Sequence, residues 1–123
     1  MKEGSSVIFL PVSDIEKTVH FYRDVLGLSV DSKQAENLYI FDTGYGYWGF
    51  CQYEDGRRPL SGKTGVCLSI NLKDDKAVLT RYEELKDVCT VIQEPKKHSV
   101  YPVYSFFVED PDGYLVEYQN VRG

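Results

Sequence analysis

The sequence contains few of the residues that hold metals or cross-link a small protein. Its 123 residues include three cysteines and two histidines. Cys51, Cys67 and Cys89 are odd in number and far apart, so they indicate neither a disulfide framework nor a C-x-x-C zinc site. We therefore expect free thiols and no structural metal.

Long apolar runs and an excess of positive charge are also missing. The stretch of about 18 apolar residues that a membrane helix needs occurs nowhere, and the apolar run at residues 7–12 is too short for a signal-peptide core. We expect a cytoplasmic protein without a membrane partner. The 14 basic and 19 acidic residues give a net charge of −5, which argues against a nucleic-acid partner and favours a neutral or cationic ligand.

Aromatic residues, in contrast, are abundant. They make up 14% of the chain, and ten of them are tyrosines. This is more than the core of a small protein needs, and it indicates an aromatic-lined cavity or an interface.

The first half of the chain predicts the element order β-α-β-β-β. Residues 6–12 have the pattern of a strand, and Ser13 with Glu16 three residues later is typical of a helix start. Gly27 is a suitable helix end. Three short strand-like runs follow, separated by polar or glycine-rich turns.

The second half repeats this order at an offset of about sixty residues. Residues 54–65 have the composition of a connecting loop, and residues 66–72 then predict a strand. Asp74 or Asp75 is expected to cap a second helix. Three more strand-like runs complete the series.

Two segments, DIEKTVHFYRDVLGL at residues 14–28 and FFVEDPDGYLVEY at residues 106–118, resemble the vicinal oxygen chelate superfamily. This superfamily contains glyoxalase I, bleomycin-resistance proteins and extradiol dioxygenases. The resemblance implies one α+β domain of two tandem β-α-β-β-β modules, whose curved sheets enclose a ligand cavity. Module one would cover about residues 5–55, a linker about 56–63 and module two about 64–120. A second chain completes the cavity in many members, so we expect a homodimer.

Strand alternation predicts which side chains of the second module face the cavity. In the strand at residues 66–72 the apolar side chains alternate with polar ones and are expected to pack on the helix. The same holds for the last strand of the module. We expect six side chains to face the cavity and contact the ligand: Cys67, Ser69, Asn71, Leu115, Glu117 and Gln119.

In the first module, alternation places Phe9 on the cavity side. If residues 51–53 correspond to residues 116–118 in the repeat, Gln52 is the counterpart of Glu117, and Trp48 and Phe50 lie on its face. Four residues of the first module are therefore expected to contact the ligand: Phe9, Trp48, Phe50 and Gln52.

The loop at residues 95–102 borders the ligand in similar proteins. Its residues His98 and Tyr101 are therefore two further candidates for ligand binding.

The resemblance also implies a metal site, because the metal enzymes of the superfamily carry His, Glu or Gln at four positions. These positions fall on Val7, Gln52, Cys67 (or Val66 if the register slips by one residue) and Glu117. Val7 has no donor atom, and one carboxylate, one amide and one thiol make a poor site for Zn²⁺ or Ni²⁺. We expect no metal and no other cofactor. The alternative retains a divalent ion such as Zn²⁺ or Ni²⁺ on Gln52, Cys67 and Glu117.

These observations favour a binding protein over an enzyme. We expect metal-independent binding of a small cationic or aromatic molecule, similar in logic to the bleomycin-resistance proteins, with Glu117 as anchor or base. One alternative is a metal-dependent lyase or isomerase of the glyoxalase I kind, with Glu117 as base or ligand. Another is a subunit whose cavity serves only assembly.

The hexapeptide GYGYWG at residues 44–49 matches the Gly-x-Gly-x-x-Gly pattern of dinucleotide-binding loops. That loop requires a helix directly after the glycines, whereas residues 48–53 continue as an aromatic strand. We predict instead a β-hairpin at Gly44 and Gly46, with Gly49 packed against the helix.

Overall fold

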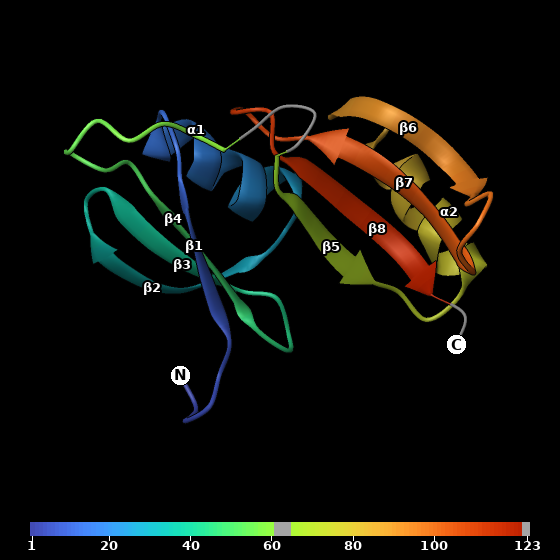
Figure 1. Cartoon of the computed structure of the whole chain (residues 1–123), viewed down its shortest axis with the longest axis horizontal. Helices are drawn as coiled ribbons and strands as arrows, with labels where there is room; N and C mark the ends of the chain where they lie inside the picture. The colour runs from blue at the N-terminus through green and yellow to red at the C-terminus, as the bar shows by residue number, and fades with distance from the viewer. Residues whose placement is uncertain (61–64, 122–123) are drawn as a thin grey trace. The chain divides into compact units, whose positions relative to one another are not determined.

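The computed structural model describes residues 1–60 and 65–121, and the chain divides into two compact units, Met1–Leu60 and Ser61–Gly123. The division falls within the segment expected to be a linker, whose last residues lie outside the described part. Each unit has the order β-α-β-β-β (Figure 1), so the predicted α+β fold of two tandem modules is confirmed. In residues 1–60 and 65–121, no helical segment is long and apolar enough to cross a bilayer.

Both units build a four-stranded sheet in which the first and last strands are parallel neighbours. The first unit contains β1 (Val7–Pro11), α1 (Ile15–Val19), the π-helical segment η1 (His20–Val25), β2 (Ser29–Ala35), β3 (Leu38–Asp42) and β4 (Tyr47–Cys51), with the strand order β1-β4-β3-β2. The second unit contains β5 (Cys67–Asn71), α2 (Asp75–Leu85), β6 (Thr90–Lys97), β7 (Val103–Glu109) and β8 (Leu115–Val121), with the strand order β5-β8-β7-β6.

The first helix begins one residue later than predicted. Asp14, not Ser13, is the N-cap: its Oδ1 accepts hydrogen bonds from the backbone N–H of Glu16 (3.1 Å) and Lys17 (3.2 Å). After α1 the helix widens into η1, which apolar spacing did not signal. Gly27, with φ of +77°, follows the helix end as expected.

The second helix begins as predicted, because Asp74 caps α2 by accepting the N–H of Ala77 at 2.8 Å. Figure 1 shows α2 lying against one face of the β5-β8-β7-β6 sheet. There Phe106 stacks on Tyr118 with 5.4 Å between the ring centroids and meets Tyr82 of α2 edge-on at 5.4 Å. This aromatic cluster forms the core between α2 and the sheet.

An aromatic cluster around Tyr22 forms the core of the first unit. Tyr22, in η1, is fully buried and stacks on Phe50 at 4.3 Å between centroids. Trp48 meets the Tyr22 ring edge-on, with 6.2 Å between the ring centroids. Trp48 and Phe50 therefore pack against the helix, and the prediction that they line a cavity on the other face is wrong.

The GYGYWG stretch forms the predicted hairpin between β3 and β4. Gly44 has φ of +102°, and the N–H of Thr43 bonds to the carbonyl of Gly46 at 3.0 Å. The prediction for Gly49 is wrong, since this residue faces away from the helix and the ring of Phe9 lies over it. A Cβ at Gly49 would lie 2.5 Å from Cδ1 of Phe9.

We predict that Gly49→Ala forces the Phe9 ring off the strand and lowers the free energy of unfolding by about 1 kcal/mol, because overpacking costs energy even where one partner can shift. Phe9 is 48% exposed, so its ring can move toward solvent, and the loss stays at the low end of the range for overpacked sites. The double variant with Phe9→Ala should lose less than the sum of the two single variants. Urea unfolding of the four proteins measures this coupling, and additive losses would show that the ring does not rest on Gly49.

Candidate functional site

The second sheet has one face covered by α2 and one face that no helix in the described part of its unit covers. Leu68, Val116 and Tyr118 are buried on the α2 side. The six residues predicted to face a cavity all lie on the other, helix-free face. Three are exposed and three half-buried: Cys67, Ser69, Asn71, Leu115, Glu117 and Gln119. Alternation thus predicted their orientation correctly, and their contact with a ligand stays a prediction.

A short hydrogen bond joins β5 to β8 at the centre of this face. Ser69 and Glu117 are register partners, and the Ser69 hydroxyl donates to Oε1 of Glu117 at 2.6 Å. Charge-assisted bonds of this length are among the stronger ones in proteins, so the bond fixes the orientation of the carboxylate. From the described residues the other oxygen, Oε2, receives no hydrogen bond. The carboxylate is positioned and keeps acceptor capacity.

Cys67 lies beside this pair but is poorly suited to nucleophilic chemistry. Its Sγ is 3.6 Å from the Ser69 hydroxyl. Desolvation by neighbouring atoms raises the pKa of the thiol, the hydrogen bond to Ser69 partly opposes this, and the charge of Glu117 raises the pKa further. The thiol is therefore protonated at neutral pH, whereas a nucleophile or a metal ligand must be a thiolate.

The Ser69–Glu117 pair continues across the whole sheet as one row of side chains. Phe107 of β7 is the register partner of Glu117, and Gln93 of β6 is the partner of Phe107. Alternation in β7 could have identified Phe107. Gln93 carried no such signal, since an irregularity between Val91 and Gln93 shifts the register. We call Ser69, Glu117, Phe107 and Gln93 the polar row.

The first unit has the same backbone arrangement with different side chains. Phe9 pairs with Gly49 at the position where Ser69 pairs with Glu117 in the second unit. Gly49 has no side chain, and the Phe9 ring fills the space above it. The true counterpart of Glu117 is therefore Gly49, and the predicted counterpart, Gln52, is wrong.

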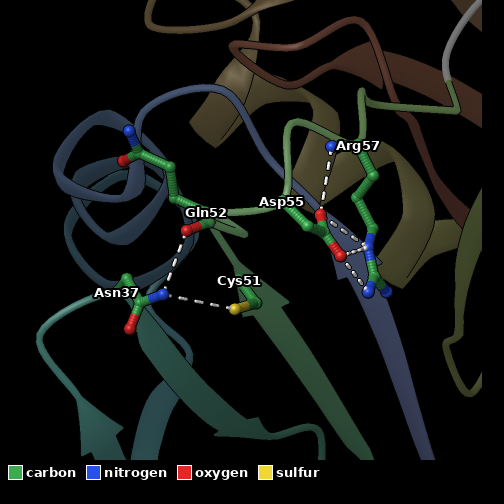
Figure 2. Close-up of polar contacts among 5 residues, drawn as sticks. All are labelled: Asn37, Cys51, Gln52, Asp55 and Arg57. Carbon is green, nitrogen blue, oxygen red and sulfur yellow. Dashed lines mark hydrogen bonds and ion pairs between the residues drawn. The ribbon is translucent and has the colours of Figure 1, made fainter.

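Gln52 follows β4 and serves to anchor the helix. Its side-chain oxygen accepts the N–H of Ile15, the first residue of α1, at 3.0 Å. Asn37 Nδ2 donates to the backbone oxygen of Gln52 at 3.0 Å and lies 3.8 Å from Sγ of Cys51 (Figure 2). The bond from Ile15 engages the side-chain oxygen of Gln52 that a metal would need.

The loop after Gln52 is held by its own ion pair. Figure 2 shows the Arg57 guanidinium against the Asp55 carboxylate, with a closest distance of 2.6 Å. Hydrogen bonds from Arg57 lower the pKa of Asp55. Arg57 also lies 3.7 Å from the centroid of the Tyr53 ring. Both charges are exposed and paired with each other, so the Asp55 carboxylate is already engaged.

The residues at the four predicted metal positions do not fit a divalent ion. Val7 has no donor in its side chain, and the side-chain oxygen of Gln52 accepts the N–H of Ile15. Gly49, the true counterpart of Glu117, has no side chain. The raised pKa of Cys67 disfavours a thiolate, which leaves Glu117 as one good donor. Histidine, cysteine and acidic side chains do not gather in potential metal-binding groups of three anywhere in the described ranges.

His98 and Tyr101 lie in the connection between β6 and β7, where His98 closes a tight loop. Nδ1 of His98 accepts the backbone N–H of Val100 and of Tyr101, each at 3.0 Å, and the His98 and Tyr101 rings are 4.7 Å apart. The hollow beside them measures about 120 Å³, well below the size of a drug-sized ligand site. The geometry gives His98 a role in loop structure, and its contact with a ligand stays a prediction.

Comparison with known proteins identifies the class to which this protein belongs. Residues 5–118 match the family model described as the Glyoxalase/Bleomycin resistance protein/Dioxygenase superfamily. The chain belongs to this superfamily, as the resemblance of the two sequence segments predicted.

Individual relatives agree with this assignment. A "Probable lactoylglutathione lyase" of Vibrio cholerae is 27% identical, over 88% of this chain and 83% of its own length. A crystal structure of a glyoxalase/bleomycin resistance protein/dioxygenase from Alicyclobacillus acidocaldarius has a TM-score of 0.79 at 15% identity and covers 98% of this chain and 93% of its own. A lactoylglutathione lyase from Agrobacterium tumefaciens has a TM-score of 0.71 at 22% identity, covering 97% and 94%. At these identities the structural matches show the fold alone.

The loop role of His98 predicts different effects for two substitutions. His98→Ala removes the acceptor of two N–H groups, and the amides of Val100 and Tyr101 should exchange with solvent roughly 2- to 10-fold faster. His98→Asn keeps a side-chain acceptor that suits such turns and should stay near the original rates. Amide hydrogen exchange followed by NMR measures both. Unchanged rates in His98→Ala would contradict the loop role.

Proposed function

We propose that the protein binds a small cationic molecule without a metal, on the helix-free face of the second unit, with Glu117 as the anchor. The observation that carries this proposal is the Ser69–Glu117 hydrogen bond of 2.6 Å. It holds a half-buried carboxylate in one orientation on the helix-free face of the sheet. A carboxylate fixed in this way does not need to reorganise when an ammonium group binds.

The surroundings of Glu117 favour positive charge. Phe107 is its neighbour on β7, and the face of an aromatic ring attracts a cation. Glu109 lies two residues further along β7 on the same face, and the whole chain carries a net charge of −5. An ammonium group beside Glu117 would therefore interact with two carboxylates and one ring.

Independence from metal is supported by the chemistry of the donor atoms. Gly49 and Phe9 stand in the first unit where Glu117 and Ser69 stand in the second, and neither contributes a donor side chain. The superfamily's metal enzymes take ligands from both halves of the repeat. A chain with donors in one half is better suited to direct recognition of a cation by its carboxylate.

The anchor role is tested by neutralising the carboxylate. We expect Glu117→Gln to weaken the binding of cationic aromatic compounds about 10-fold, because the acceptor loses the negative charge that strengthens its bond to an ammonium group. The matched control is Glu94→Gln, since Glu94 approaches Tyr82 on the α2 side of the same sheet. Isothermal titration calorimetry with a panel of aromatic amines, at low and high salt, measures the change.

Added Zn²⁺ or Ni²⁺ should leave these affinities unchanged. The anchor role is contradicted if both substitutions weaken binding equally. It also fails if binding requires a divalent ion.

The second candidate is a lyase of the lactoylglutathione kind, favoured by the 27% identity with the Vibrio cholerae protein. This candidate requires Gln52, Cys67 and Glu117 to bind a metal ion. The side-chain oxygen of Gln52 already accepts a hydrogen bond from Ile15, and the raised pKa of Cys67 disfavours the thiolate that a metal needs.

We expect protein purified without chelator to form no lactoylglutathione above the uncatalysed rate, with or without added Zn²⁺ or Ni²⁺. The chromophore of the thioester product allows the reaction to be followed by absorbance. Metal-dependent product formation that disappears in Glu117→Gln would replace the binding proposal with this one.

A further inference from the structure

The polar row places four different chemical groups in a line across the sheet. Ser69, Glu117, Phe107 and Gln93 are successive register partners on β5, β8, β7 and β6. Neighbouring strands lie about 4.8 Å apart, so Glu117 and Gln93 are separated by two steps, or about 10 Å. This is the length of one small elongated molecule.

Each group in the row suits a different part of such a molecule. The Glu117 carboxylate suits an ammonium group, and the Phe107 ring suits a flat or apolar middle. The Gln93 side chain can both donate and accept hydrogen bonds. Among the described residues it has no hydrogen-bond partner, and it is half-buried.

Charge at the far end of the sheet sets the direction of the ligand. Lys96, also on β6, pairs with Ser105 in the row next to the polar row and on the same face. Its positive charge disfavours a cation near β6, while Glu117 and Glu109 favour one near β8 and β7. The ammonium end therefore belongs at Glu117 and an uncharged end at Gln93.

From this arrangement we infer that the ligand class is an amine with an aromatic or cyclic middle and an uncharged hydrogen-bonding group at the opposite end. The inference rests on the proposed function and adds the order of the three parts. The ammonium contacts Glu117, the ring lies over Phe107, and the polar end bonds to the Gln93 amide. Ser69 acts as a positioning residue that orients Glu117.

Three small probes separate the parts of this inference. Tyramine has an ammonium group, a ring and a hydroxyl at the far end. Phenethylamine lacks the hydroxyl, and tyrosol has a hydroxyl in place of the ammonium. NMR titration of ¹⁵N-labelled protein measures affinity even when binding is weak, and it also reports which strand responds.

We expect tyramine to bind roughly 3- to 10-fold more tightly than phenethylamine, the worth of one net hydrogen bond, and tyrosol to bind most weakly. Tyramine and phenethylamine should both shift the amide signals of Glu117 and Phe107. Tyramine should in addition shift the side-chain amide signals of Gln93. In Gln93→Leu the two amines should bind equally, while Gln34→Leu, an exposed glutamine substitution in the first unit, should retain the difference.

The outcomes distinguish this inference from the proposal on which it rests. If the two amines bind equally and Glu117→Gln weakens both, cation binding stands and the role of Gln93 is overturned. If tyramine still binds more tightly than phenethylamine in Gln93→Leu, the role of Gln93 is overturned as well. If neither amine binds more tightly than tyrosol and Glu117→Gln has no effect, the proposed function fails and the inference fails with it.

Discussion

The parallel pairing between the first and last strands of each unit is the constraint on which the site depends. A helix buries one face of each sheet, so the register of this pair decides which side chains enter the core. In the second unit the pairing of Ser69 with Glu117 places both on the helix-free face. A shift by one residue would put the carboxylate under α2, in the place of a side chain of the aromatic and apolar core. The aromatic core on the other side therefore also fixes the orientation of Glu117.

The same pairing in the first unit gives the opposite chemistry. Phe9 and Gly49 occupy the equivalent positions, and the ring covers the bare backbone of the glycine. A side chain at residue 49 would displace the ring, so the two residues depend on each other. The two repeats thus retain one backbone plan while only one of them carries a carboxylate at this position. This asymmetry is the main reason to favour direct binding of a cation over a metal site shared by both repeats.

How far the sequence predicts the structure depends on how clearly each strand alternates. β5 and residues 116–119 of β8 alternate apolar with polar residues, and their orientation was predicted correctly. In β4 the aromatic residues Tyr47 and Trp48 are adjacent, and Gly49 separates Trp48 from Phe50. No polar residue marks either face, so alternation did not show which face of this strand packs against the helix. Aligning residues 51–53 with residues 116–118, which matched Gln52 to Glu117, was wrong by three positions, since the counterpart is Gly49. An odd shift exchanges the two faces, which is why Trp48 and Phe50 were predicted on the wrong side.

The strand β6 shows a feature of the site that the sequence pattern did not signal. Val91 pairs with Val108 on the α2 side, and regular pairing would then place Ile92 beside Phe107. The structure places Gln93 there instead, and Ile92 is the extra residue, 49% exposed. A bulge of this kind turns the following side chains to the other face. One additional residue thus replaces an isoleucine by a hydrogen-bonding amide at the end of the polar row, which gives the row chemically different ends.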